Sequence, residues 1–284
     1  MESITFECEV ITPMFLAGAD GVTPELRAPS IKGALRFWWR AMNGHLSLKE
    51  LKEQEGKIFG NTASRSQVII RVHQKDLQSA DSEMVPHKPF MKRPAFLPNQ
   101  QFEVTLMLSK SKDLSIEQLK NLFLLTCYLG GFGKRSRRGM GSVNIIKCDA
   151  QNWKLTPITI EYIHSLLHSL SKHFVLTNGS IYNSYSGRME LYPWIKQIQL
   201  GEPNSRILRV ISDTTNEVHK RGSYAYEPSL GHAFKGRFAS PIFVSTVFGS
   251  LKPIITTLNT VPDRGRNDID RTMQENFKNQ ILNL

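Results

Sequence analysis

Three cations on one helical face are the clearest chemical feature of the sequence. Lys32, Arg36 and Arg40, here called the basic stripe, follow one another at intervals of four residues. A helix would place them in one line, each about one turn (~5.4 Å) from the next. Trp39 would lie between this line and the core, where its indole can stack on a nucleobase or on an arginine. The stripe contains no interleaved carboxylate, which favours contacts with phosphates; an ordinary solvated helix face is the alternative.

The second cationic feature is a glycine-rich loop, residues 130–142, with the sequence GGFGKRSRRGMGS. Its glycines, Gly131 and Gly133 among them, allow backbone N–H groups to turn toward an anion. Four basic side chains are present to neutralise that anion: Lys134, Arg135, Arg137 and Arg138. The spacing fits neither a P-loop nor a dinucleotide-binding fingerprint, so we expect a loop that clamps a nucleic-acid backbone. A flexible basic surface turn is the alternative.

Patterns for catalysis or metal binding are weak. His164 and His168 are spaced to share a helix face, but they lie at the edge of its apolar side, as ordinary surface histidines do. We therefore expect no metal site. The sequence contains neither H-E-x-x-H nor G-x-S-x-G, the signatures of common metalloproteases and hydrolases. These observations favour a binding protein without a cofactor over an enzyme.

The composition is that of a globular protein with a basic surplus. Hydrophobic residues make up 40% of the 284 residues, and 36 Lys and Arg against 25 Asp and Glu give a formal net charge of +11. The two halves of the chain share this surplus almost equally, and it points to a polyanionic partner or an anionic surface. The three cysteines form no C-x-x-C motif, and apolar runs stay short of 18 residues. We expect a cytoplasmic protein without a membrane span.

The elements that must position the stripe and the loop follow the order β-α-β-β-α-β. We expect strands over residues 4–10, 67–73, 101–109 and 142–147, and helices over 31–42 and 115–129. Ser30 would cap the first helix and Ser115 the second. This order is typical of a ferredoxin-like fold, so we expect an α+β protein with an N-terminal domain at residues 1–150. Four prolines in the insertion at residues 76–100 predict that it forms no regular structure.

Residues 151–284 predict a second, degenerate α+β domain. We expect helices over 159–174, 202–219 and 267–282, strands over 241–249 and 253–258, and a polar turn over 178–187. In the first of these helices the apolar residues recur at helical spacing and share one face.

Several motifs resemble those of the RAMP superfamily. The likeness is greatest to the group that forms the first RAMP subunit of the Cmr (type III-B) CRISPR effector complex. It rests on residues 12–20 (TPMFLAGAD) and 24–40 (PELRAPSIKGALRFWWR). Residues 58–60 (IFG), the glycine-rich loop and residues 237–241 (RFASP) match the same pattern.

The resemblance implies two ferredoxin-like, RRM-related domains, of which the second is degenerate. It also implies a non-catalytic, RNA-binding subunit of an antiviral ribonucleoprotein that contacts guide RNA and target RNA near the 3′ end of the guide, beside the other Cmr complex subunits. The stripe and the four basic side chains of the glycine-rich loop would then contact RNA. Two alternatives remain. One is a metal-independent endoribonuclease that matures guide RNA, with His45 as the nearest candidate base. The other is a structural subunit that touches little RNA.

Overall fold

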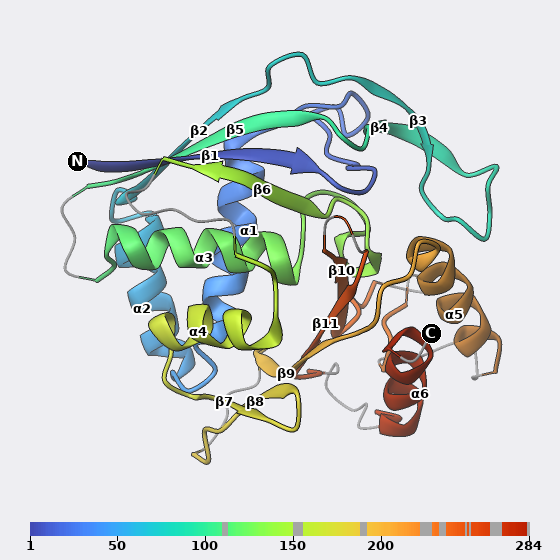
Figure 1. Cartoon of the computed structure of the whole chain (residues 1–284). Helices are drawn as coiled ribbons and strands as arrows, with labels where there is room; N and C mark the ends of the chain where they lie inside the picture. Colours follow the sequence, from blue (N-terminus) through green and yellow to red (C-terminus); the bar gives the residue numbers. More distant parts are fainter. Residues whose placement is uncertain are drawn as a thin grey trace.

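The structure is a computed structural model of the 284-residue chain. It describes residues 1–109, 113–149, 156–187, 192–221, 229–232, 237–247, 249, 251–261 and 269–282. Two antiparallel sheets share a central helix, α3 (Ile116–Leu129), and a two-stranded hairpin extends beyond the end of the first sheet (Figure 1). The fold class is α+β, as the sequence predicts.

The first sheet is ferredoxin-like. The elements of this part of the chain are β1 (Glu2–Val10), α1 (Ala28–Met42), α2 (Leu48–Phe59), β2 (Val68–His73), β3 (Ser79–Glu83), β4 (Lys92–Phe96), β5 (Gln101–Leu108), α3, the 3₁₀ turn η1 (Ser136–Arg138) and β6 (Val143–Cys148). The strands are arranged in the order β2-β5-β1-β6, and all neighbours are antiparallel. This is the predicted β-α-β-β-α-β order, with α2 and the β3–β4 hairpin as insertions.

Helix starts follow from local sequence, with one correction. At α3 the predicted cap is confirmed, because the Gln118 backbone N–H donates to Ser115 Oγ at 3.1 Å. At α1 the predicted cap at Ser30 is wrong. The N-cap is Arg27, which makes no side-chain capping hydrogen bond, and Pro29 lies in the first turn. Proline is accommodated there because the first N–H groups of a helix have no intrahelical acceptor.

Two elements of the first domain are absent from the sequence prediction. Helix α2 begins at a capping box in which Ser47 and Glu50 exchange hydrogen bonds. The insertion at residues 76–100 forms the β3–β4 hairpin, so the expectation of no regular structure is wrong. Pro94 lies in β4 opposite Asp81, and a two-stranded ribbon has edges at which the missing N–H of proline interrupts no ladder.

The second sheet is a degenerate version of the first. Its part of the chain holds α4 (Ile160–Leu170), β7 (Phe174–Thr177), β8 (Ser180–Asn183), β9 (Ile195–Leu200), α5 (Ile207–Arg221), β10 (Ile242–Thr246), β11 (Pro253–Leu258) and α6 (Arg271–Leu282). The strand order is β10-β11-β9-β8-β7, with antiparallel neighbours. The run β9-α5-β10-β11-α6 follows the ferredoxin order, and β8 occupies the position beside β9 that the last strand of that order would take, with β7 beyond it at the edge.

Element boundaries in this half differ from the prediction. The helix predicted over 159–174 ends at Leu170, and Phe174 begins β7. The segment predicted as a polar turn contains β8, which pairs with β7 across a tight turn at Asn178 and Gly179, both with positive φ. The helix predicted over 202–219 begins at Ile207. The last helix begins at Arg271, and residues 262–268 lie outside the described residues.

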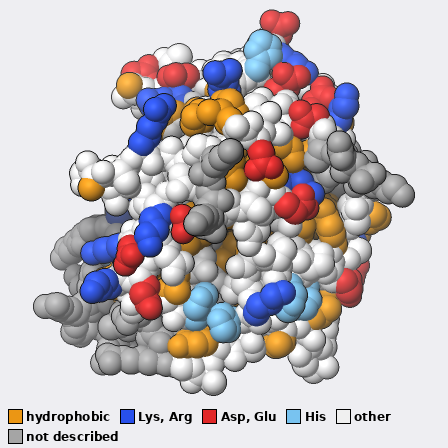
Figure 2. Space-filling model, turned by 90° about the vertical axis from the view of Figure 1, so that its left-hand side faces the viewer, with side chains coloured by type: hydrophobic (Ala, Val, Ile, Leu, Met, Phe, Trp, Pro, Cys, Tyr) orange, Lys and Arg blue, Asp and Glu red, His pale blue; other side chains and the backbone are white. Residues whose placement is uncertain are grey.

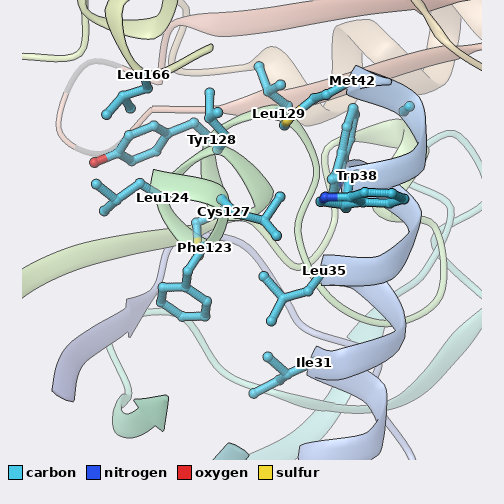
Figure 3. Packing of buried hydrophobic residues seen from close by; sticks show 14 of the residues in the cluster. Ile31, Leu35, Trp38, Met42, Phe123, Leu124, Cys127, Tyr128, Leu129 and Leu166 are labelled. Atoms are coloured by element: carbon cyan, nitrogen blue, oxygen red, sulfur yellow. The ribbon is translucent and has the colours of Figure 1, made fainter. Parts of the chain in front are cut away.

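One hydrophobic core runs through both halves of the chain. The apolar residues of α1 point at α3, so this face meets a helix as well as the sheet (Figure 3). Every residue of α3 from Asn121 to Leu129 is buried, because α3 contacts strands of both sheets. A second cluster fills the space between the second sheet and helices α5 and α6.

Candidate nucleic-acid interface

The basic stripe lies on α1 as predicted, but α2 supplies it with a carboxylate. Glu55 Oε1 accepts hydrogen bonds of 2.6 Å from Arg36 Nε and from Arg40 Nη1. Glu55 is only 7% exposed, whereas the two arginine side chains are 36% and 37% exposed. One carboxylate therefore holds two guanidinium groups one helical turn apart, and the pair keeps a net positive charge.

The other two predicted residues of α1 are held by the protein itself. Lys32 Nζ donates to Ser66 Oγ at 2.6 Å and to the Val68 carbonyl at 3.0 Å. Burial, and then the charge of Arg36, lower the pKa of Lys32. Trp39 is buried, and its ring meets that of Phe59 edge-on at 6.4 Å. The indole of Trp39 is therefore a core side chain that packs between α1 and α2.

The glycine-rich loop is shaped by close backbone approaches. Gly131 and Gly133 have φ values of 123° and 92°, a region that favours glycine. A Cβ at Gly133 would lie 2.5 Å from the Phe15 carbonyl oxygen. The backbone N–H of Lys134 donates to that same carbonyl, and the N–H of Phe132 donates to the Gly141 carbonyl, both at 2.9 Å. These N–H groups turn toward carbonyl oxygens of the protein, where the sequence predicted an anion.

Two arginines of the loop join it to the second domain. Arg138 is 8% exposed and donates to the carbonyls of Ile242 and Leu230, both at 2.9 Å. Burial, with smaller effects of the two neighbouring arginines, lowers the pKa of Arg138 to about 9. Arg137 donates to the Ser240 carbonyl, and its guanidinium lies 4.4 Å from the centre of the Phe243 ring. Burial lowers the pKa of Arg137 to about 10.

The remaining loop cations differ in exposure. Arg135 has left-handed backbone geometry (φ 60°), and its Nε is buried without a hydrogen-bond partner among the described residues. Burial lowers its pKa. Lys134 is exposed, and its Nζ donates to the Gly21 carbonyl at 2.8 Å. It borders a cleft that also contains Lys92 and Arg93 of β4. Sequence reasoning missed these two residues, although the adjacent cations in the insertion are a signal for them.

The amino-acid sequence is similar to those of known CRISPR proteins. The profile of the RAMP superfamily matches residues 7–144. Over 179 residues the chain is 30% identical to the CRISPR system Cmr subunit Cmr1-2 of Pyrococcus furiosus, covering 51% of this chain and 96% of that protein. The chain belongs to the RAMP superfamily. It is also 32% identical over 176 residues to Cmr1-1 of the same organism. That alignment covers 55% of this chain and 52% of Cmr1-1.

Similarity to solved structures extends over the whole fold. The crystal structure of apo Cmr1 from P. furiosus superposes with a TM-score of 0.63 at 21% identity, covering 99% of this chain and 96% of that one. A subunit of the type III-B Cmr-beta complex bound to cognate target RNA gives a TM-score of 0.61 at 11% identity, covering 98% and 99%. At these identities the likeness concerns the fold, and it includes the degenerate second domain.

A pair of histidines lies where the two domains of this RAMP protein meet. The ring of His45, just after α1, lies 4.3 Å from that of His173, and the Tyr185 ring lies 5.2 Å from His173. The Nδ1 atom of His45 is buried and has no hydrogen-bond partner among the described residues. Burial and then His173 lower the pKa of His45, against a smaller opposite effect of Glu50. Protonation of His45 is therefore disfavoured in this partly desolvated site.

The surface carries side chains of both charges. In Figure 2 cationic side chains are interspersed with acidic ones, and histidines are visible both at the top and in the lower part of this face. His164 Nε2 lies 3.0 Å from the Phe174 carbonyl oxygen. The described residues contain no group of three or more His, Cys, Asp or Glu side chains that would hold a metal. Within the same residues, every helix is too short or too polar to cross a bilayer.

Proposed function

We propose that the chain is a non-catalytic, RNA-binding subunit of a type III-B CRISPR ribonucleoprotein. It contacts guide RNA and target RNA near the 3′ end of the guide, beside the other Cmr subunits. Membership of the RAMP superfamily and the likeness to Cmr1 proteins support the assignment to this class of complex. The observation that carries RNA binding is the arrangement of Arg36 and Arg40 on the single buried carboxylate of Glu55.

This arrangement suits phosphates because it is charged and already ordered. Glu55 uses one oxygen to fix both guanidinium groups, so little side-chain entropy is lost when RNA binds. Each arginine retains N–H donors on its solvent-facing side, and arginine donors form strong, directional hydrogen bonds with phosphate oxygens. Contacts of this kind set the position of RNA without reading its sequence.

The test is RNA binding by the purified full chain, measured by fluorescence anisotropy with EDTA present. The probes are a labelled guide RNA and its duplex with a target strand. We expect the logarithm of the affinity to fall linearly with the logarithm of the salt concentration, because neutralised phosphates release counterions. We also expect the RNA to remain intact. Affinity that does not change with salt, or no binding by the chain alone and no RNA crosslink to it within the assembled complex, would contradict the proposal.

A second candidate function, a metal-independent endoribonuclease that matures guide RNA, is favoured by the His45–His173 pair. General acid–base cleavage of RNA needs two groups that exchange protons near neutral pH, and the neutral His45 with its unpartnered Nδ1 is a suitable base. Labelled repeat RNA in EDTA tests this directly. Cleavage lost in His45→Ala and His173→Ala, but kept in the exposed control His168→Ala, would establish it. Intact RNA with the wild-type chain would exclude it.

A further inference from the structure

A cleft of about 470 Å³ lies at the base of the β3–β4 hairpin. Three segments that are distant in sequence line it: the loop after Phe15, the hairpin and the glycine-rich loop. The hairpin extends beyond the end of the first sheet (Figure 1), so the cleft lies to one side of the ferredoxin-like core. The insertion at residues 76–100 and the glycine-rich loop both contribute side chains to its lining.

The charge in the cleft is strongly unbalanced. Lys92, Arg93 and Lys134 line it, with Asp81 as the acidic residue on its wall. Among the described residues, none of the three cations lies within 4.0 Å of a carboxylate oxygen. The contrast with the basic stripe is clear, because the two stripe arginines are already bound to Glu55. Three exposed cations without ion-pair partners create a local positive potential that an anion can neutralise.

The walls of the cleft are tied together by backbone hydrogen bonds. Met14 and Phe96 exchange N–H···O=C bonds of 3.0 Å, which fix the hairpin base to the loop before Phe15. The N–H of Lys134 donates to the Phe15 carbonyl at 2.9 Å, which fixes the glycine-rich loop to the same segment. The backbone segments that carry the three cations are therefore held together without a ligand.

We propose that this cleft holds consecutive phosphates of a single-stranded RNA. The inference rests on the proposed function and assigns a role to the insertion. The cations stand on two different walls, and the cleft is much larger than one phosphate ion, so a chain of phosphates fits it better than a free anion. Val22, 62% exposed at the rim, offers an apolar surface for a ribose. The contacts would be independent of base sequence.

The experiment compares the variant Lys92→Gln/Arg93→Gln/Lys134→Gln with wild type for binding of a labelled single-stranded RNA at 50–200 mM salt. Loss of three phosphate contacts lowers the slope of log affinity against log salt by about 2 for single strands. The affinity lost between 50 and 200 mM should then shrink by about 15-fold. The control, Lys49→Gln/Lys52→Gln, removes two exposed cations of α2 and should leave the slope near that of wild type.

The outcomes separate the cleft assignment from the proposed function. A triple variant with the slope and affinity of wild type overturns the cleft assignment and leaves the proposed function standing. Wild-type chain that binds no RNA by itself and forms no RNA crosslink within the assembled complex contradicts the proposed function itself. Tripolyphosphate that competes as well as RNA at equal phosphate concentration shows a small-anion site and overturns the RNA assignment. Thermal melting checks that the triple variant folds, and Lys92→Arg/Arg93→Lys, which keeps both charges, should retain the wild-type slope.

Discussion

Replacing Glu55 by Gln should weaken the fold and strengthen RNA binding at the same time. The carboxylate lies almost buried between Arg36 and Arg40 and accepts a 2.6 Å hydrogen bond from each. The substitution keeps the size of the side chain and an amide oxygen that can still accept hydrogen bonds from the two guanidinium groups, but it removes the negative charge. Stability and affinity should therefore move in opposite directions, which a general disruption of the protein would not produce.

The loss of stability follows from the exposure of the partners. A hydrogen bond to a charged group contributes about 1.5–3 kcal/mol, and breaking a fully buried ion pair costs about 3–5 kcal/mol. Here both arginine side chains are more than a third exposed, so water solvates them when the carboxylate is gone. For the same reason solvent screens their attraction to Glu55 in the wild-type protein. We expect the free energy of unfolding to fall by about 2 kcal/mol and Tm by roughly 5 °C.

The gain in affinity follows from the freed guanidinium groups. With no carboxylate beside them, Arg36 and Arg40 can neutralise one further phosphate, and the salt slope for single-stranded RNA should steepen by about 0.7. Anisotropy titrations and thermal melting measure the two effects. The control is Glu53→Gln, which makes the same charge change at an exposed position of α2, where Glu53 pairs with Lys57. A Glu55→Gln protein that melts with wild type, or binds RNA no more tightly than Glu53→Gln, would refute the reasoning.

Three further predictions concern the domain joint and the glycine-rich loop. The pKa of His45 in the folded protein lies below its usual value. Below about pH 6.5 the unfolded chain therefore binds the proton more readily than the folded one, and stability falls. Melting temperatures measured from pH 8 to 5 should decline less in His45→Gln than in wild type. Arg138→Gln should cost about 2–4 kcal/mol in urea unfolding, because two buried carbonyls lose their donor. Gly133→Ala should cost about 1–3 kcal/mol, since its Cβ would meet the Phe15 carbonyl. Gly21→Ala, at φ 71° with open space around the Cβ, is the matched control and should cost about 1 kcal/mol.

The spacing of the residues correctly predicts the line of cations on α1, but it does not predict the carboxylate of Glu55 beside them. The line of Lys32, Arg36 and Arg40 follows from the helical repeat, which is a local property. Glu55 lies on a different helix, and its approach depends on how α1 and α2 pack, which local spacing does not contain. The helix itself was within reach of the sequence, because the capping box of Ser47 and Glu50 marks its start.

The glycine-rich loop illustrates a different limit. Its glycines do mark positions of positive φ and close backbone approach. The same backbone geometry serves an anion or a carbonyl of the protein, so the sequence alone leaves the two indistinguishable. Arg137 and Arg138 were predicted to contact RNA, and this stays a prediction, while the structure shows that carbonyls and rings of the second domain hold their guanidinium groups.

The prolines of the insertion at residues 76–100 do not prevent it from forming strands. Proline is disfavoured in the interior of a sheet but tolerated at an edge, and both strands of an isolated ribbon are edges. Pro94 lies in such a ribbon. The topology of the second domain was out of reach for another reason. Its last strand position is taken by β8, which precedes β9 in the chain, and short strands with weak alternation carry little information about their pairing partners.

The burial of α3 between the two sheets has a consequence for how the protein is dissected. A cut near residue 150 would leave this helix with one apolar side facing water, because the strands that cover that side belong to the second half. Each half would then be an aggregation-prone fragment instead of a folding unit. The two ferredoxin-like halves should therefore unfold together, because both cover α3.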